Sequence, residues 1–259
     1  MIPFRWSNIL LLLITASIPL AAQHNGPVLA PGAGYFVFNV HAGGVLVRGG
    51  GSFTSACDCR FDESPTGFGA YLGAGVSYGI SDNLAVLARV AAQPYTASYE
   101  KVRATTIPAR GSDGIIRLQK VTMRRSADMS LTRFSCSVLG QWRSGIGGLW
   151  LAAGPEFSLV LPGRYTDADE VLGCVADYES TGTPCAWVVA DKALDAQFAD
   201  LRIGLVSVSM IAGYDLVFME TMTLTPELGW SYQLTALVPT HPTLKHNPLH
   251  LGVSLGMRL

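Results

Sequence analysis

The C-terminal residues of the chain alternate between apolar side chains and small or polar ones. Leu251, Val253 and Leu255 fall on one face of an extended segment, whereas Gly252 and Ser254 fall on the other. Successive side chains of a β-strand point to opposite faces, so this period of two predicts a strand with one apolar face. A fully alternating strand at this position is typical of a closed membrane barrel, because lipid leaves no strand edge unpaired.

The same alternation occurs in seven further segments, and the connections between them are alternately long and short. This pattern predicts an all-β fold, an eight-stranded antiparallel up-and-down transmembrane β-barrel with short turns at one end and long loops at the other. The barrel domain is expected to occupy residues 23–259, without a second domain. The strands are expected at residues 35–47, 67–79, 84–99, 129–143, 149–161, 200–214, 222–234 and 251–259.

Two local features modify this prediction. Within 200–214 the apolar positions change parity, so we expect a β-bulge between Leu205 and Val206. The segments 101–107 and 115–125 flank a turn-like sequence, and we expect them to extend the third and fourth strands beyond the membrane.

Composition supports a membrane barrel. Only 14% of the residues are charged and 49% are hydrophobic, whereas soluble domains carry about 25% charged residues. After the N-terminal region no run of about 20 apolar residues occurs, which excludes helical membrane spans as the main architecture. The net charge of −1 gives no reason to expect a nucleic-acid partner.

The N-terminal region has the pattern of a secretory signal. Arg5 supplies a positive charge, residues 9–18 are apolar, and small residues precede Gln23. We therefore expect residues 1–22 to be a cleavable signal peptide; the alternative is a membrane anchor.

Together these features resemble the small eight-stranded bacterial outer-membrane β-barrel family, of the OmpA-transmembrane or OmpX type. The resemblance covers nearly the whole chain after the signal, and it includes Gly213-Tyr214 before a turn, residues 225–230 after it, and the terminal strand at 251–259. It implies a place in the bacterial outer membrane, contact with outer-membrane lipid and lipopolysaccharide, and recognition of the last strand by the barrel-assembly machinery.

Charged residues also occur at positions that should face the lumen. An eight-stranded barrel is filled by its own side chains, so these charges should pair with one another and with interior water. One face of the 67–79 strand is almost entirely glycine, which leaves room for bulky side chains inside the tube. A polar network that holds the tube in shape is the first interpretation, and a gated ion or proton path is the second. The predicted interior network contains Arg89, Arg133, Arg143, Glu156, Arg202, Glu227 and Arg258.

Some of these inward residues also allow a catalytic interpretation. His41 and His250 should lie on neighbouring strands, and with Ser254 and either Glu156 or Glu227 they supply the residue types of a Ser/His/acid site. Their spacing is not diagnostic, so we expect no enzyme, no cofactor and no metal. A lipid A-modifying barrel enzyme, which has a precedent among membrane barrels, is the alternative.

The loops divide by charge. Residues 100–126 hold seven basic and two acidic residues, whereas residues 163–199 hold seven acidic and two basic ones. The basic hairpin is expected either to bind lipopolysaccharide phosphates, to dock the acidic loop, or to be simply solvated. The acidic loop has a second option, a weak divalent-cation site at Asp167, Asp169 and Glu170. The basic residues are Lys101, Arg103, Arg110, Arg117, Lys120, Arg124 and Arg125.

Five cysteines follow the signal. Cys174 and Cys185 lie in one predicted external loop, and an exported protein can join them by a disulfide. Cys57 and Cys59 are too close in sequence for an easy mutual disulfide, and either pairing with the long loop or metal binding remains open for them. Cys136 is expected to be a free thiol facing lipid.

The sequence thus favours an integral outer-membrane barrel with a structural or surface-interaction role through long external loops. Its partners would be membrane lipid and a possible surface ligand. Three rivals remain: a lipid A-modifying enzyme, a transporter of small solutes or hydrophobic ligands, and a soluble secreted β-sandwich.

Overall fold

The structure is a computed structural model of the chain. It describes residues 34–50, 53–54, 60–61, 65–110, 115–144, 147–171, 188–193, 198, 201–241 and 243–259. The predicted signal peptide at 1–22 lies outside the described residues, as do Cys57, Cys59, Cys174 and Cys185. Cys136 is described, exposed and free. No helix in the described part of the chain is long and apolar enough to cross a membrane.

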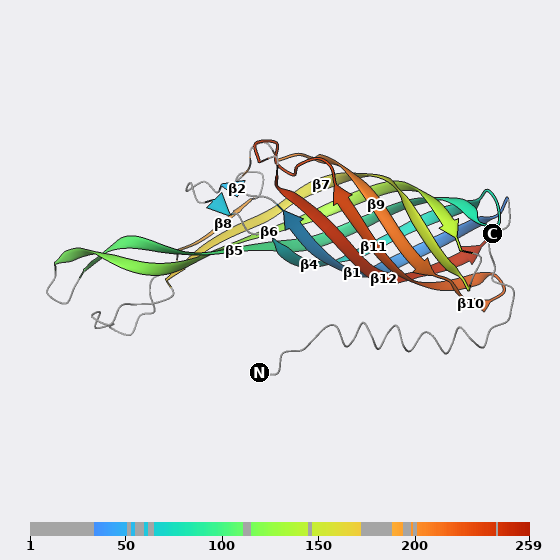
Figure 1. Cartoon of the computed structure of the whole chain (residues 1–259), viewed down its shortest axis with the longest axis horizontal. Coiled ribbons are helices and arrows are strands. Elements are labelled where there is room, and N and C mark those ends of the chain that lie inside the picture. The colour runs from blue at the N-terminus through green and yellow to red at the C-terminus, as the bar shows by residue number, and fades with distance from the viewer. Residues whose placement is uncertain are drawn as a thin grey trace.

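Eight long strands form the wall of the molecule (Figure 1). They are β1 (Phe36–Gly50), β4 (Thr66–Gly79), β5 (Leu84–Arg110), β6 (Ile116–Arg143), β7 (Leu149–Val171), β9 (Gly204–Tyr214), β11 (Met222–Gln233) and β12 (Lys245–Arg258). Four short strands accompany them, namely β2 (Phe53–Thr54), β3 (Arg60–Phe61), β8 (Val188–Ala193) and β10 (Leu216–Met219).

The eight long strands close into a ring. Each pairs antiparallel with its neighbour in the chain, β9 pairs with both β7 and β11, and β12 pairs with β1. At the seam, the Leu259 amide donates to the Phe36 carbonyl at 3.0 Å. The predicted all-β, eight-stranded antiparallel barrel is therefore confirmed.

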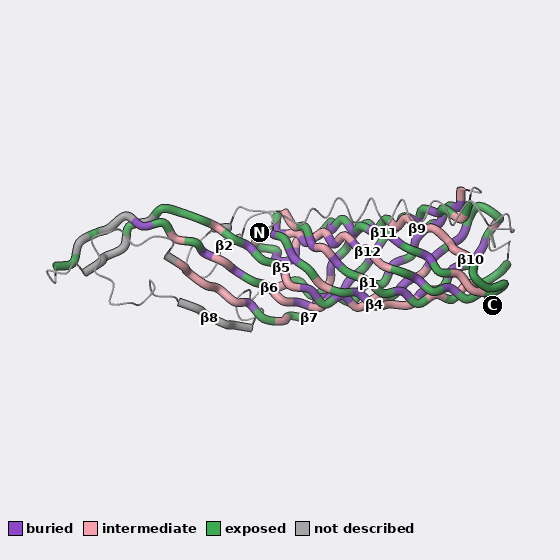
Figure 2. The backbone as a smooth tube through the Cα atoms, turned by 90° about the horizontal axis from the view of Figure 1, so that it is seen from below, coloured by how far each residue is buried: buried purple, intermediate pink, exposed green. Residues whose placement is uncertain are grey.

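Alternation along the strands sorts side chains between the two faces of the wall (Figure 2). Outward positions are apolar, and seven of the exposed aromatic residues on this face are candidates for girdles at the membrane interfaces. They are Phe36, Phe38, Tyr78, Trp142, Phe157, Trp230 and Tyr232. Inward positions carry serines, glutamines, histidines and charged side chains, so the polar groups of the barrel lie in its lumen.

The predicted bulge at Leu205 and Val206 is wrong. The ladder of β9 with β7 continues through this segment without a register shift. Leu205 points inward among the buried core residues, and Val206 begins the regular outward row. The parity change arose because Leu201 and Ile203 precede the strand. The β6–β7 ladder instead shifts between Met129 and Leu131.

The strands β5, β6 and β7 are much longer than the other strands of the wall. The β5–β6 ladder continues to the pair Arg110↔Ile116, β7 follows β6 as far as Val171, and β8 adds to β7. Figure 1 shows these strands projecting well past the end of the other strands. The predicted extension of two strands is confirmed. The segment from residue 163, predicted as a polar loop, instead contributes its first residues to β7 because they pair with β6.

Candidate functional site

The centre of the lumen is organised by Arg133, whose side chain is completely buried on β6. Its guanidinium pairs with Glu156 of β7. Arg133 Nε also donates to Ser158 Oγ at 2.7 Å, and Nη2 donates to Ser207 Oγ at 2.9 Å. From β11, Ser231 donates to the second oxygen of Glu156 at 3.2 Å. One ion pair thus ties together four strands.

A second ion pair crosses the lumen. Arg89 Nη2 of β5 donates to Glu227 Oε2 of β11 at 2.6 Å, and both side chains are buried. β5 and β11 are four strands apart in either direction around the ring. The pair therefore connects opposite walls of the barrel. This is possible because both residues occupy inward positions in the alternating pattern of their strands.

A third cluster closes the end of the barrel that carries the short turns. Asp215 lies between β9 and β10 and accepts three hydrogen bonds. The donors are Arg143 Nη1 at 2.6 Å, Trp150 Nε1 at 2.9 Å and Thr225 Oγ1 at 2.7 Å. Sequence reasoning missed Asp215 because the predicted strand ended at Tyr214, one residue before it. Its parity matches the inward residues Ser207 and Ser209, and that signal would have identified it.

Two residues of the predicted network lie elsewhere. Arg202 is exposed and precedes β9, so its expected inward orientation, which relied on the wrong start of this strand, is incorrect. Arg258 is half-buried at the end of β12 and stacks on Tyr35, with its guanidinium carbon 3.7 Å from the ring centroid. The other five residues of the predicted network lie buried in the lumen as members of the three ion pairs, joined by Asp215.

A small cavity of about 30 Å³ lies beside the two central ion pairs. Four buried polar atoms of its lining have no hydrogen-bond partner in the described part of the chain: His41 Nδ1, Arg89 Nε, Gln93 Oε1 and His250 Nε2. A polar cavity of this size has room for one or two water molecules. This mixture of donors and acceptors fits neutral water better than an ion.

The candidate Ser/His/acid residues are only partly brought together. His41 and His250 are on the adjacent strands β1 and β12, and both rings lie near Tyr71, with centroid separations of 5.7 and 5.2 Å. His41 faces Ser254 in the ladder. A catalytic histidine uses both ring nitrogens, one toward the serine and one toward the acid. Because His41 Nδ1 and His250 Nε2 are unpartnered among the described residues, neither ring has this arrangement.

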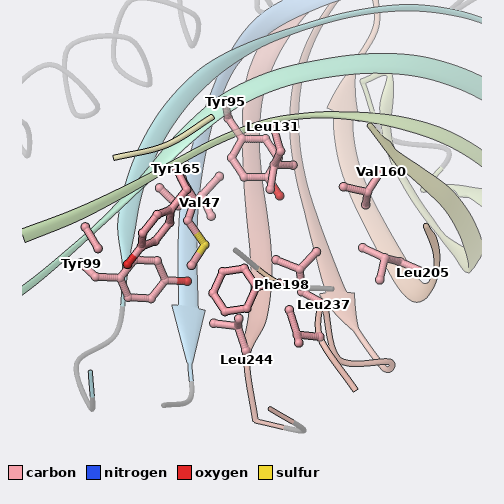
Figure 3. Packing of buried hydrophobic residues seen from close by; sticks show 14 of the residues in the cluster. Val47, Tyr95, Tyr99, Leu131, Val160, Tyr165, Phe198, Leu205, Leu237 and Leu244 are labelled. Atoms are coloured by element: carbon pink, nitrogen blue, oxygen red, sulfur yellow. The ribbon is translucent and has the colours of Figure 1, made fainter. Parts of the chain in front are cut away.

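The lumen toward the long loops is filled by a buried apolar cluster (Figure 3). Wall residues such as Leu131 and Val160 meet Phe198, Leu237 and Leu244 from the connecting segments. We call this group the apolar plug. It fills the tube above the polar network, so the described lumen contains buried side chains at both levels.

A buried histidine lies at the edge of the apolar plug. His246 Nε2 is 2.7 Å from the Tyr99 hydroxyl, and His246 Nδ1 is 3.2 Å from the Tyr95 hydroxyl. Its backbone amide donates to Gln233 Oε1 at 3.0 Å. The sequence prediction placed His246 in a loop, whereas β12 already begins at Lys245.

The basic hairpin meets the acidic segment at the base of the projecting strands. Arg125 Nη2 is 2.5 Å from Asp167 Oδ2, and Arg125 Nε is 3.6 Å from Asp169 Oδ1. The exposed Arg124 pairs with Glu100 at 2.7 Å and Glu170 at 3.2 Å.

Of the interpretations considered for these loops, docking of the acidic segment on the hairpin is therefore the one that this geometry favours. Among the described residues no group of three or more potential metal ligands is found. The carboxylates considered for a divalent cation face arginines instead.

No family model matches the chain, and no curated protein matches it. Solved outer-membrane structures are similar at low identity. Neisserial surface protein A shares 12% identity, with 86% of this chain and 96% of that chain covered and a TM-score of 0.36. OprG of Pseudomonas aeruginosa shares 10%, with 88% and 98% covered and a TM-score of 0.37. Ail of Yersinia pestis shares 10%, with 87% and 99% covered and a TM-score of 0.33.

Proposed function

We propose that this protein is an integral β-barrel of the bacterial outer membrane that presents a basic β-ribbon to negatively charged material outside the cell. We define the ribbon as residues 101–123, the distal parts of β5 and β6 with their connection. The observation that carries the proposal is the contrast between a filled lumen and a ribbon that projects far past the rest of the wall.

The outward face supports a membrane location. Rows of exposed leucine, valine and phenylalanine cover the strands all around the ring, as in the row Leu251, Val253 and Leu255 of β12. Soluble monomers rarely expose continuous apolar patches above a few hundred Å². A closed ring also leaves no unpaired strand edge, which is what a lipid environment requires.

The lumen supports an interactive role over transport. Buried ion pairs cross its centre and the apolar plug fills the end toward the long loops. Moving a solute through it would require breaking several of these contacts, and unpaired buried charges are costly. The histidines of the lumen lack the bonds of a catalytic site, so the geometry also offers the enzyme alternative little support.

The ribbon supports an anionic partner. The acidic segment matches Arg124 and Arg125 at the ribbon's base. By composition, residues 101–123 hold five basic residues, Lys101, Arg103, Arg110, Arg117 and Lys120, against the single acidic residue Asp113. A narrow basic surface raises the local concentration of anionic partners and speeds their association.

Retention on immobilised heparin tests this function. The purified protein in detergent should be retained and released by salt, and a variant with glutamine at all five basic ribbon positions should pass through. A control with Thr106→Ser, Gln119→Asn and Thr122→Ser changes the same strands without changing charge and should behave as wild type. Equal retention of the glutamine variant and the wild type would exclude the ribbon as the binding surface.

Fractionation of expressing cells tests the location separately. We expect the protein in the outer-membrane fraction, migrating differently on gels before and after boiling, as folded barrels do. Protein that remains soluble in the periplasm without this shift would contradict the membrane assignment and favour the secreted sandwich.

A further inference from the structure

We infer that the outer ends of β1 and β12 form a binding site for the phosphorylated headgroup of a lipid in the surrounding leaflet. The residues that carry this inference are Arg48, Lys245 and Asn247, which we call the wall site. It lies on the lipid-facing side of the barrel and is distinct from both the lumen and the ribbon. The inference rests on the membrane location proposed above.

The distribution of charge on this wall is the first argument. The outward rows of the adjacent strands β11, β12 and β1 consist of apolar and small residues over most of their length, with no acidic residue. Their only charged members are Arg48 and Lys245. Both are at the end toward the long loops, where a barrel meets the outer headgroups. An anion here would meet two positive charges and no competing carboxylate on these rows.

The ladder places the three residues of the wall site together. Arg48 is opposite Asn247, and Lys245 is opposite Gly50, so Arg48 and Lys245 occupy a diagonal across one antiparallel pair. Diagonal neighbours have Cα atoms roughly 7–8 Å apart, within reach of long side chains. In the described part of the chain, Arg48 is exposed and forms no ion pair.

Asn247 supplies a third donor between the two cations. Its side-chain oxygen accepts a hydrogen bond from the backbone amide of Gln233 at 2.9 Å. This bond fixes the orientation of the amide group and leaves its nitrogen to donate outward. Guanidinium, ammonium and amide donors around one position suit the three oxygens of a phosphate.

Aromatic side chains mark the level of the headgroups. Lys245 Nζ lies 5.5 Å from the centroid of the Tyr232 ring, and the ring centroids of Tyr232 and Trp230 are 5.7 Å apart. Both aromatic rings are exposed on the outward face of β11. Tyrosine and tryptophan concentrate at membrane interfaces, so the wall site lies at the depth where lipid phosphates are found.

Two further cations toward the long loops are in a different setting. Arg124 of β6 is matched by Glu100 and Glu170. Arg164 is an exposed residue of β7, which is diametrically opposite β1 in the ring. Arg164 therefore offers a control that removes one exposed cation without touching the wall site.

The test is native mass spectrometry of the purified protein in detergent with bisphosphorylated lipid A. Wild type should retain at least one lipid, the Arg48→Gln and Lys245→Gln double variant should bind it roughly tenfold more weakly, and Arg164→Gln should match wild type. Dephosphorylated lipid A should bind wild type no better than it binds the double variant. A gel shift on boiling shows for each variant that the barrel is folded.

Three results would overturn the inference: wild type that retains no lipid A, a double variant that retains it as well as wild type, or a loss in Arg164→Gln as large as in the double variant. Because fractionation measures location independently, a protein that is in the outer membrane but fails this test contradicts the wall site alone.

Discussion

Arg89 and Glu227 form an ion pair across the full width of the barrel, with 2.6 Å between Nη2 and Oε2. The strands that carry them, β5 and β11, are on opposite sides of the ring. No backbone hydrogen bond can join these two strands, so the side chains provide the connection. The pair acts as a strut that fixes the diameter of the tube at this level.

Removing one partner of this strut should be more damaging than removing both. Glu227→Gln leaves a buried guanidinium without its counter-charge, and we expect a loss of about 3–5 kcal/mol in the free energy of unfolding. The double variant Arg89→Met, Glu227→Leu should recover most of this loss because no charge remains buried. Denaturant titration in lipid vesicles measures both. A double variant less stable than Glu227→Gln would contradict this role of the pair.

Glycine on the inner face is required where large rings pack. A Cβ added at Gly213 would collide with the Trp150 ring, and one at Gly252 would collide with the Tyr71 hydroxyl and the Ala42 carbonyl. We expect Gly213→Ala and Gly252→Ala each to cost about 1–3 kcal/mol in unfolding free energy. Gly44→Ala is the matched control, because nothing lies within 4 Å of a Cβ at that position. A cost at Gly44 equal to the others would indicate a general effect of β-strand glycine instead.

The wall of the barrel was predictable from the sequence because each strand carries its own signal. A period of two along a segment assigns every side chain to the outer or the inner face of the wall without knowledge of the neighbours. Arg133 and Glu156 were placed correctly inside on this basis alone. The errors at Arg202 and Leu205 arose because the strand that became β9 was predicted to start too early. An error in a strand boundary assigns the residues near it to the wrong face.

The partners within the lumen were not predictable in the same way. That Arg89 pairs with Glu227 and not with Glu156 depends on the stagger of strands around the closed ring, which alternation does not encode. The contacts of Asp215 and His246 depend on strands that continue past a turn or past Pro248. At these positions the alternation of apolar and polar residues is interrupted, so the sequence does not reveal that the strand continues. The alternation of inward and outward side chains nevertheless continues in β12.

The apolar plug gives a prediction about transport. Because Leu244 is fully buried among Phe198, Leu237 and their neighbours, wild type should show no steady conductance in planar bilayers. Leu244→Ala should cost about 2–5 kcal/mol in unfolding free energy, whereas Leu234→Ala, at a half-exposed outward position, should cost far less. Regular single-channel currents from wild type would favour the transporter alternative.

The two arginines at the base of the ribbon should contribute differently to the stability of this region. Arg125 and Asp167 are largely buried, with side-chain exposures of 8% and 15%, whereas Arg124 and Glu100 have exposures of 44% and 56%. Exposed pairs contribute about 0–1 kcal/mol, and breaking a buried pair costs several times more. Hydrogen exchange should therefore rise at residues 123–129 and 165–171 in Arg125→Gln and stay near wild type in Arg124→Gln. Equal exchange in both variants would show that burial is not what distinguishes these pairs.

The disulfide predicted between Cys174 and Cys185 concerns residues outside the described part of the chain, and it can be tested chemically. In a Cys57→Ser, Cys59→Ser background, we expect a maleimide reagent to label one thiol per denatured molecule before reduction and three after it. The single reactive thiol before reduction should be Cys136, which is free, and Cys136→Ser should abolish that labelling.

A ring closed by residues this close in sequence constrains the unfolded chain by roughly 3 kcal/mol, so reduction should speed proteolysis within the loop more than in the barrel. Three thiols labelled without reduction would contradict the pairing and leave the loop without a covalent constraint.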